Sequence, residues 1–262
     1  MKIITFLTDF GTADSYVAQM KGVASSLSDA RLIDITHDIR PHHIREAAFL
    51  LQTIVPYYPL GSVHVVVVDP GVGTSRKGLL ITTKTQILVG PDNGVLLPAA
   101  HFLGEFTVYE IINKTYLLDT PSNTFHGRDV FTPVAAHITN GVPFDQIGQQ
   151  TTEYIDLNLG NAEITEQTVE GKIVYIDRFG NLITNIPWYR LRDVFTYGKT
   201  AMVFLGSHSR TMPFVQTYGL AGVGEPLLTI GSSNYLEISM NQGNASELFS
   251  VKEDDDVKLL FK

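Results

Sequence analysis

The chain of 262 residues is predicted to fold as α/β, with an N-terminal domain built on a mainly parallel sheet and a smaller C-terminal all-β barrel. Two observations support this. Apolar strand-like runs alternate with amphipathic helical segments in the first half, which is typical of α/β layers. From Glu170 onward, short strands separated by turns follow one another with no strong helix, as in a small barrel. We expect domains at residues 1–155 and 169–262, joined by a linker at 156–168.

The N-terminal domain begins with a buried strand at Met1–Leu7, a short apolar run containing β-branched residues. A helix is predicted at Ser15–Leu27, where apolar residues recur at helical spacing. The segment Ser62–Val68 is apolar on both faces, which indicates a parallel strand covered by helices on both sides. The other predicted elements are strands at Arg31–Thr36, Gly78–Thr83, Gln86–Gly90 and Phe106–Ile112 and a helix at Ile44–Val55.

A last helix of this domain is predicted at Arg128–Thr139, and it contains Pro133. Proline removes a backbone donor and clashes with the preceding turn, so the helix is expected either to kink there or to begin only at Thr132. Residues 149–161 show little periodicity and are interpreted as linker. The predicted barrel strands have the sequences GKIVYID, TAMVFLG, EPLLTIG, NYLEISM and DDVKLLF.

Charge and composition disfavour several classes of protein. The formal net charge is −8, with no cluster of Lys and Arg, so neither nucleic acid nor a membrane surface is an expected partner. The chain has no cysteine, which excludes disulfides, thiolate catalysis and Cys-ligated zinc. The first apolar run is too short for a signal peptide, and no run approaches the ~20 residues that span a bilayer. We therefore expect a cytoplasmic protein.

Polar residues follow the predicted parallel strands, at the edge where α/β sheets bind ligands. Asp9 follows the first strand and is suited either to accept hydrogen bonds from a ribose diol or to cap a turn. Asp69 follows the third strand in a glycine-rich segment that matches neither a Walker loop nor a dinucleotide fingerprint. Arg76 is the expected partner of Asp69, in a functional site or in a structural ion pair.

Two further segments carry candidate site residues. His126 precedes the Pro133 helix and is suited to act as an acid, a base or an orienting donor, or to be purely structural. Asp177, Phe179 and Asn181 follow a C-terminal strand, where an aromatic ring and an amide can hold a base or simply form a β-turn. A metal site formed by His42, His43, Asp9 and Asp69 has no recognised ligand spacing, so no metal is predicted.

Five segments taken together resemble one family, the S-adenosylmethionine (SAM) hydroxide adenosyltransferases, which are related to the SAM-dependent fluorinase and chlorinase. They are LTDFGTADSYVAQMKG, DPGVGTSR, FHGRDVF, IDRFGNLITNI and SSNYLEIS with NQGNAS, in this order along nearly the whole chain. The resemblance implies an N-terminal α/β domain and a C-terminal β-barrel. It also implies a homotrimer with SAM held between the N-domain of one subunit and the C-domain of its neighbour.

The resemblance also assigns roles to residues. The water-activating triad of the family falls on Asp69, Arg76 and His126, with Asp69 expected to orient the other two. The remaining assignments are Asp9 to the ribose diol, Asp177 to the methionine ammonium, Ser232 and Ser233 to the methionine end, Phe179 and Asn181 to adenine, and Tyr218 to a stacking aromatic across a one-residue gap. The halogenating relatives differ at the Asp and His positions of the triad, and the halide-contacting serine is Gly127 here. This pattern favours water as the nucleophile.

The function that the resemblance implies is hydrolysis of SAM to adenosine and L-methionine, through attack of water or hydroxide at the ribose C5′. SAM is the substrate and no cofactor is expected. Three alternatives remain open from the sequence: a non-catalytic SAM- or adenosine-binding trimer, a SAM-dependent halogenase, and a metal-dependent nucleoside hydrolase.

Overall fold

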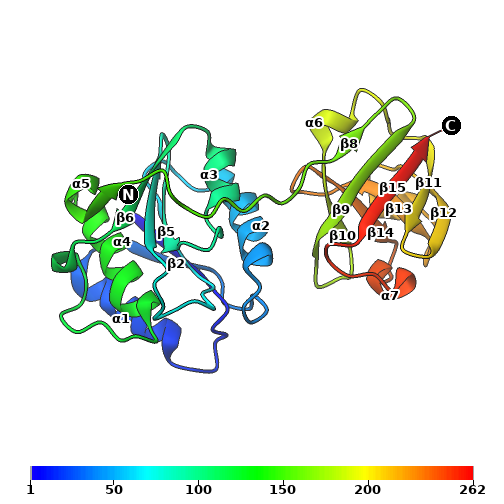
Figure 1. Cartoon of the computed structure of the whole chain (residues 1–262). Coiled ribbons are helices and arrows are strands. Elements are labelled where there is room, and N and C mark those ends of the chain that lie inside the picture. The colour runs from blue at the N-terminus through cyan, green and yellow to red at the C-terminus, as the bar shows by residue number, and fades with distance from the viewer. Residues whose placement is uncertain (1, 262) are drawn as a thin grey trace. The chain divides into compact units, whose positions relative to one another are not determined.

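The computed structural model describes residues 2–261, which divide into two units at the boundary between Asn158 and Leu159 (Figure 1). This boundary lies inside the segment 156–168 that the sequence analysis assigned to a linker. Met1, the first residue of the predicted first strand, lies outside the described residues. Each unit has its own sheet and its own buried apolar core.

The first unit contains a seven-stranded sheet in the order β2-β1-β3-β5-β4-β6-β7. The half formed by β2, β1, β3 and β5 is parallel, and β4, β6 and β7 extend it in antiparallel fashion. The strands are β1 (Ile3–Thr8), β2 (Arg31–Thr36), β3 (Val63–Val67), β4 (Gly78–Thr83), β5 (Ile87–Pro91), β6 (Phe106–Ile111) and β7 (Gly148–Gln150). The predicted α/β class is thus confirmed for this unit.

Helices cover both faces of this sheet, as the apolar character of β3 predicted. Val65 and Val67 pack into one core cluster with residues of α1 (Tyr16–Leu27) and α4 (Thr132–Thr139). Val66 and Val68 belong to a second cluster, with α2 (Ile44–Ile54) and α3 (Leu97–Leu103). Because successive side chains of a strand point to opposite faces, a strand between two helical layers is buried at every position, as β3 is. Helix α3 was not predicted from the sequence. A single turn of 3₁₀ helix, Val55–Tyr57, follows α2.

The segment around Pro133 begins with a π-helical turn, η3 (Gly127–Phe131), which continues directly into α4. Of the two alternatives left open, the structure shows the α-helix beginning at Thr132. Both the backbone N–H and the hydroxyl of Thr132 donate to the Gly127 carbonyl, the hydroxyl at 2.7 Å. Pro133 is the second residue of α4, and the carbonyl of Asp129, four residues earlier, accepts instead from the backbone N–H of Leu118 at 3.0 Å. Turns of π-helix occur frequently at functional sites.

The second unit is an antiparallel, nearly closed sheet in the order β12-β11-β15-β9-β10-β14-β13, with β8 paired to β9. An isolated bridge between Phe214 and Leu228 links the segment after β12 to β13. The strands are β8 (Glu163–Ile164), β9 (Thr168–Ile176), β10 (Leu182–Pro187), β11 (Thr200–Leu205), β12 (His208–Pro213), β13 (Pro226–Ile230), β14 (Tyr235–Met240) and β15 (Asp256–Phe261). The barrel prediction is confirmed, although β8, β10 and β12 and the short helices α6 (Trp188–Leu191) and α7 (Ala245–Phe249) were missed.

Candidate active site

A cavity of about 320 Å³ lies in the first unit, where the carboxyl ends of two parallel strands meet the start of η3. Asp9 directly follows β1, Asp69 lies just beyond β3, and His126 is the residue before η3. Because β1 and β3 are adjacent and parallel, their carboxyl ends present these groups at the same edge of the sheet. The lining residues are Asp9, Phe10, Tyr16, Pro41, His42, Val67, Asp69, Val72, Thr124, Phe125, His126 and Gly127.

Asp69, Arg76 and His126 form a continuous chain of hydrogen bonds. Both carboxylate oxygens of Asp69 accept from the Arg76 guanidinium, with Nε 2.9 Å from Oδ1 and Nη2 bound to Oδ2. Nη2 of Arg76 also lies 2.8 Å from Nδ1 of His126. The side chains of Asp69 and Arg76 are only 5% and 10% exposed, and a forked pair of this kind has a fixed geometry. Arg76 therefore links Asp69 to His126 by hydrogen bonds.

This contact determines which nitrogen of His126 carries the proton. A guanidinium only donates hydrogen bonds, so Nδ1 of His126 must accept, and the ring is the neutral tautomer with its hydrogen on Nε2. Burial lowers the pKa of His126, and the neighbouring Arg76 charge lowers it further, against the opposing charges of Asp69 and Asp129. His126 thus enters the cavity as a neutral hydrogen-bond donor.

Asp9 lies beside an apolar wall of the same cavity. Its Oδ2 accepts a hydrogen bond of 2.8 Å from the backbone N–H of His42, which has a left-handed backbone with φ of +67°. The rings of Phe10, Tyr16 and Phe125 contact one another with centroids 5.3–5.7 Å apart. A carboxylate next to exposed aromatic surface suits a ligand with both hydroxyl and apolar parts.

The neighbours of Gly127 leave little space for a side chain at this position. A Cβ atom at this position would lie 3.3 Å from Sδ of Met20 and 3.3 Å from Cγ1 of Val67, closer than ordinary contact. Gly127 therefore has little room for any side chain. The resemblance aligns this position with the halide-contacting serine of the halogenases.

Three of the predicted site residues of the second unit, Asp177, Phe179 and Asn181, lie in the turn between β9 and β10. Asp177 accepts hydrogen bonds from the backbone N–H groups of Phe179 and Asn181 and from Nδ2 of Asn181, at 2.8, 2.9 and 2.9 Å. This carboxylate therefore holds its own turn together. The Phe179 side chain is left 71% exposed while Asn181 is buried.

Tyr218 is anchored by a residue that the sequence analysis missed. Its hydroxyl donates to Oε1 of Glu237 at 2.8 Å, and the Ser239 hydroxyl donates to the same oxygen at 2.6 Å. Burial, then the hydrogen bond and charge of Glu237, then the charge of Asp177 raise the pKa of Tyr218, so the phenol keeps its proton. Glu237 lies in β14, in a strand pattern that gives no sign of a buried carboxylate. Ser232 and Ser233 lie in the turn between β13 and β14, exposed and half-buried respectively.

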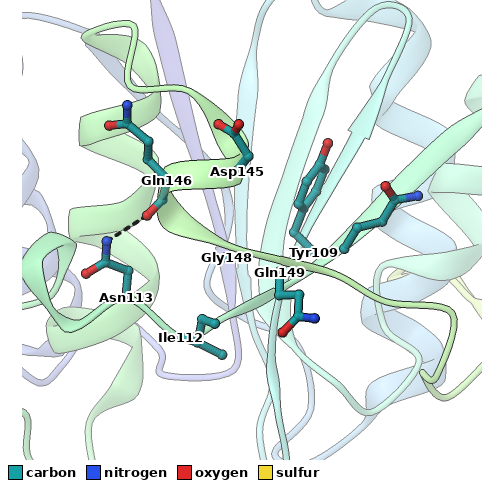
Figure 2. A pocket seen from close by; sticks show the side chains of 8 residues that line it. Tyr109, Ile112, Asn113, Asp145, Gln146, Gly148 and Gln149 are labelled. Carbon is teal, nitrogen blue, oxygen red and sulfur yellow. Dashed lines mark hydrogen bonds between the residues drawn. The ribbon is translucent and has the colours of Figure 1, made fainter.

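A second hollow of the first unit, of about 660 Å³, lies along β6 and β7 (Figure 2). Figure 2 shows mostly amide side chains around it, and Nδ2 of Asn113 donates to the Gln146 carbonyl at 2.7 Å. None of the predicted site residues lines it. Its lining is Tyr109, Ile112, Asn113, Asp145, Gln146, Gly148, Gln149 and Gln150.

Within residues 2–261, no group of three or more His, Asp or Glu side chains is arranged to hold a metal ion. In the same range, no helix combines the length and the apolar character needed to cross a membrane.

The fold and the site define an α/β protein with a cavity lined by aromatic and charged side chains at the carboxyl end of its parallel strands, followed by an antiparallel β unit. Family models for the SAM hydroxide adenosyltransferase N-terminal and C-terminal domains match residues 4–148 and 171–258. The chain belongs to the SAM hydroxide adenosyltransferase family.

Relatives and solved structures agree with this assignment. The chain is similar to an (R)-S-adenosyl-L-methionine hydrolase of Methanocaldococcus jannaschii, with 35% identity over 100% of this chain and 97% of the relative. A fluorinase of Actinopolyspora mzabensis is 25% identical over 98% of this chain and 96% of its own length. The crystal structure of an uncharacterized conserved protein from Thermotoga maritima superposes with a TM-score of 0.93 and 37% identity, covering 98% of this chain and 99% of the other.

Proposed function

We propose that this protein hydrolyses SAM to adenosine and L-methionine by attack of water at the ribose C5′. The observation that carries the proposal is the buried Asp69–Arg76–His126 chain, which ends at a cavity also lined by Asp9. The relatives at about 35% identity over the whole chain, which are named (R)-S-adenosyl-L-methionine hydrolase, support the same substrate.

The reaction needs help at the nucleophile. A new C–O bond forms at C5′ while the C–S bond breaks, and its electron pair stays on sulfur, so methionine leaves as a neutral thioether without an acid. Water is a weak nucleophile, and positioning it in line with the C–S bond supplies much of the catalysis. The Nε2 hydrogen of His126 is suited to hold the water oxygen, and Asp69 and Arg76 fix the ring that carries it.

This arrangement assigns His126 an orienting role. Its Nδ1 lone pair is occupied by Arg76 and its Nε2 carries hydrogen, so no lone pair of the ring is left to take a proton from water. The attacking water keeps both hydrogens until its oxygen has bonded to carbon, when its acidity rises sharply and one is lost to solvent.

The second unit is proposed to bind the rest of SAM. Phe179, Asn181 and Tyr218 are assigned to adenine, and Asp177, Ser232 and Ser233 to the methionine portion. Because the resemblance places SAM between subunits, we propose a homotrimer. The exposed ring of Phe179 supports this, since a large exposed aromatic side chain beside polar groups is typical of a binding surface.

Product analysis tests the proposal. The purified protein is incubated with SAM in chloride-free buffer, and the products are separated by chromatography. Adenosine and methionine are expected, and Asp69→Ala should abolish them. Asp156→Ala, at an exposed ion pair with His101 outside the cavity, should retain wild-type turnover.

Each alternative has its own outcome. Intact SAM with measurable binding indicates a non-catalytic binding protein. A halide-dependent 5′-halo-5′-deoxyadenosine product indicates a halogenase. Activity that is lost in a chelator indicates a metal-dependent nucleoside hydrolase.

A further inference from the structure

A chain of polar side chains behind the carboxyl end of β1 has no part in the chemistry proposed above. Oγ1 of Thr8, the last residue of β1, lies 2.9 Å from Nδ1 of His37, and Nε2 of the same ring lies 3.1 Å from Oδ1 of Asp34. Thr8 and His37 are 0% and 4% exposed, so the ring lies inside the protein and out of reach of a ligand.

The hydrogen positions in this chain follow from its donors. Oγ1 of Thr8 accepts from the backbone N–H of Phe10 at 3.3 Å, so its own hydrogen is left for Nδ1 of His37. Nε2 of His37 then carries the ring hydrogen toward Asp34. Within residues 2–261, Nε2 of His37 has no partner in hydrogen-bond geometry, so its 3.1 Å contact with Asp34 acts through the charge of the carboxylate. Burial opposes ionisation of Asp34, but its contacts with Lys21 and His37 outweigh this effect and lower the pKa of that carboxyl.

The same chain joins the two loops that present Asp9. Asp9 directly follows Thr8, and the backbone N–H of Gly11 donates to the His37 carbonyl at 2.8 Å. Asp9 in turn accepts from the backbone N–H of His42 at 2.8 Å. Of these three links between the loops, the contact between Thr8 and His37 is the one made between two side chains, so substitution can remove it without changing the backbone.

We propose that His37 is a positioning residue that fixes Asp9 in the orientation needed to bind the ribose diol of SAM. This inference rests on the proposed function of the site. His37 acts through Thr8 and touches no substrate atom. The negative charge of Asp34, 3.1 Å from Nε2, favours the ring tautomer that accepts from Thr8.

Substitutions of His37 that either keep or remove the contact with Thr8 test this role. In His37→Asn the amide oxygen takes the place of Nδ1, so the Thr8 contact is kept and the SAM KM should stay within about twofold of wild type. His37→Gln and His37→Phe lose that contact, and their KM should rise roughly tenfold. The kcat should be unchanged in all three, because the ribose contact is made equally in the ground and transition states.

His64 provides a matched control. His64 is also buried, and its Nδ1 lies 2.8 Å from Oγ1 of Thr5. Thr5 lies in β1, three residues before Thr8. His64→Phe should lower the melting temperature and leave the SAM KM unchanged. A double variant adds a second control, because His37→Phe should not raise KM further once Asp9→Ala has removed the carboxylate.

The outcomes separate this inference from the proposed function. The inference is overturned if His37→Gln and His37→Phe lower only the melting temperature, or if His64→Phe raises KM as much. If wild-type protein leaves SAM intact, the proposed function is wrong, and adenosine binding by calorimetry decides the inference instead. Weaker binding in His37→Gln than in His37→Asn supports it, and equal binding overturns it.

Discussion

At the residue scale, the chemistry depends on which atoms of His126 are available. Arg76 occupies Nδ1, so the useful group is the Nε2 hydrogen, and the low exposure of Asp69 and Arg76 keeps this arrangement fixed. The sequence identified all three residues as candidates. It did not show that the Arg76 guanidinium links Asp69 to His126 by hydrogen bonds, because such links depend on where the side chains lie in three dimensions.

The first prediction separates the two nitrogens of His126. In His126→Gln the amide nitrogen takes the place of Nε2 and retains the donor, whereas His126→Asn retains only the position facing Arg76. We expect kcat to fall less in the Gln variant than in the Asn variant, and to fall by roughly 10²-fold or more in the Asn variant. Steady-state kinetics with SAM measures both. Equal kcat values in the two variants would show that the Nε2 donor is not used.

The second prediction concerns pH. Burial and the Arg76 charge lower the pKa of His126, so the neutral ring persists below the ordinary histidine value near 6.5. We expect kcat to stay constant from pH 8 to pH 6.5 and to fall only at lower pH, when Nδ1 takes up a proton and its bond to Arg76 is lost. A profile that rises through pH 6.5 to 8 would instead point to a base with an ordinary histidine pKa.

At the element scale, η3 and the carboxyl ends of the parallel strands β1 and β3 position the site. The π-helical turn presents His126 at the cavity and leads into α4 past Pro133. The sequence identified the proline conflict. Which of the two solutions the chain adopts depends on packing, because Gly127 must fit between Met20 and Val67.

The third prediction tests that fit. Gly127→Val would push a side chain against Met20 and Val67, so we expect a loss of roughly 2 kcal/mol in the free energy of unfolding, together with reduced kcat. Urea unfolding provides the measurement. The control is Gly22→Ala in α1, where nothing lies within 4 Å of the added Cβ and stability should rise by about 1 kcal/mol. Similar stability changes in both variants would contradict the packing argument.

The fourth prediction concerns the buried His64 in β3. Burial lowers its pKa to about 4, against a hydrogen bond to Gln86, so the folded state excludes a proton that the unfolded chain binds below about 6.5. The His64 contribution is therefore fully present above pH 6.5 and is lost as pH falls toward 4, by roughly 3 kcal/mol. Urea unfolding at pH 7, 5.5 and 4.5 should show this loss in wild type and a smaller one in His64→Asn. An equal loss in both would assign the pH dependence to other groups.

At the scale of the whole molecule, two units with separate cores carry two sets of candidate residues. The first unit holds the hydrogen-bonded triad and Asp9 in one cavity. The second unit presents the turn at Asp177 and the pair Tyr218 and Glu237. In the proposed function, the first set acts on the ribose and the attacking water, and the second set binds the adenine and the methionine portion of SAM.

The fifth prediction belongs to this scale. If the site is completed by a neighbouring subunit, light scattering should give a mass about three times the 28.9 kDa of one chain. Turnover per chain should then fall on dilution through the range where the assembly dissociates. A monomer that retains full SAM turnover at every concentration would contradict the homotrimer.

The sequence by itself determined the α/β and all-β character of the two parts and most of the strands. It did so because strands buried on both faces, amphipathic helices and turn-rich barrels leave periodic patterns that need no knowledge of partners. It missed the very short strands β7 and β8, and also β10 and β12, which contain polar residues and end in proline. It also missed Glu237 and the positioning contact of His37. Only the tertiary structure decided these, because a buried polar group is stable only beside partners that the fold brings from distant parts of the chain. Tyr218 donates to Glu237, and Thr8 contacts Nδ1 of His37, and local periodicity encodes neither pairing.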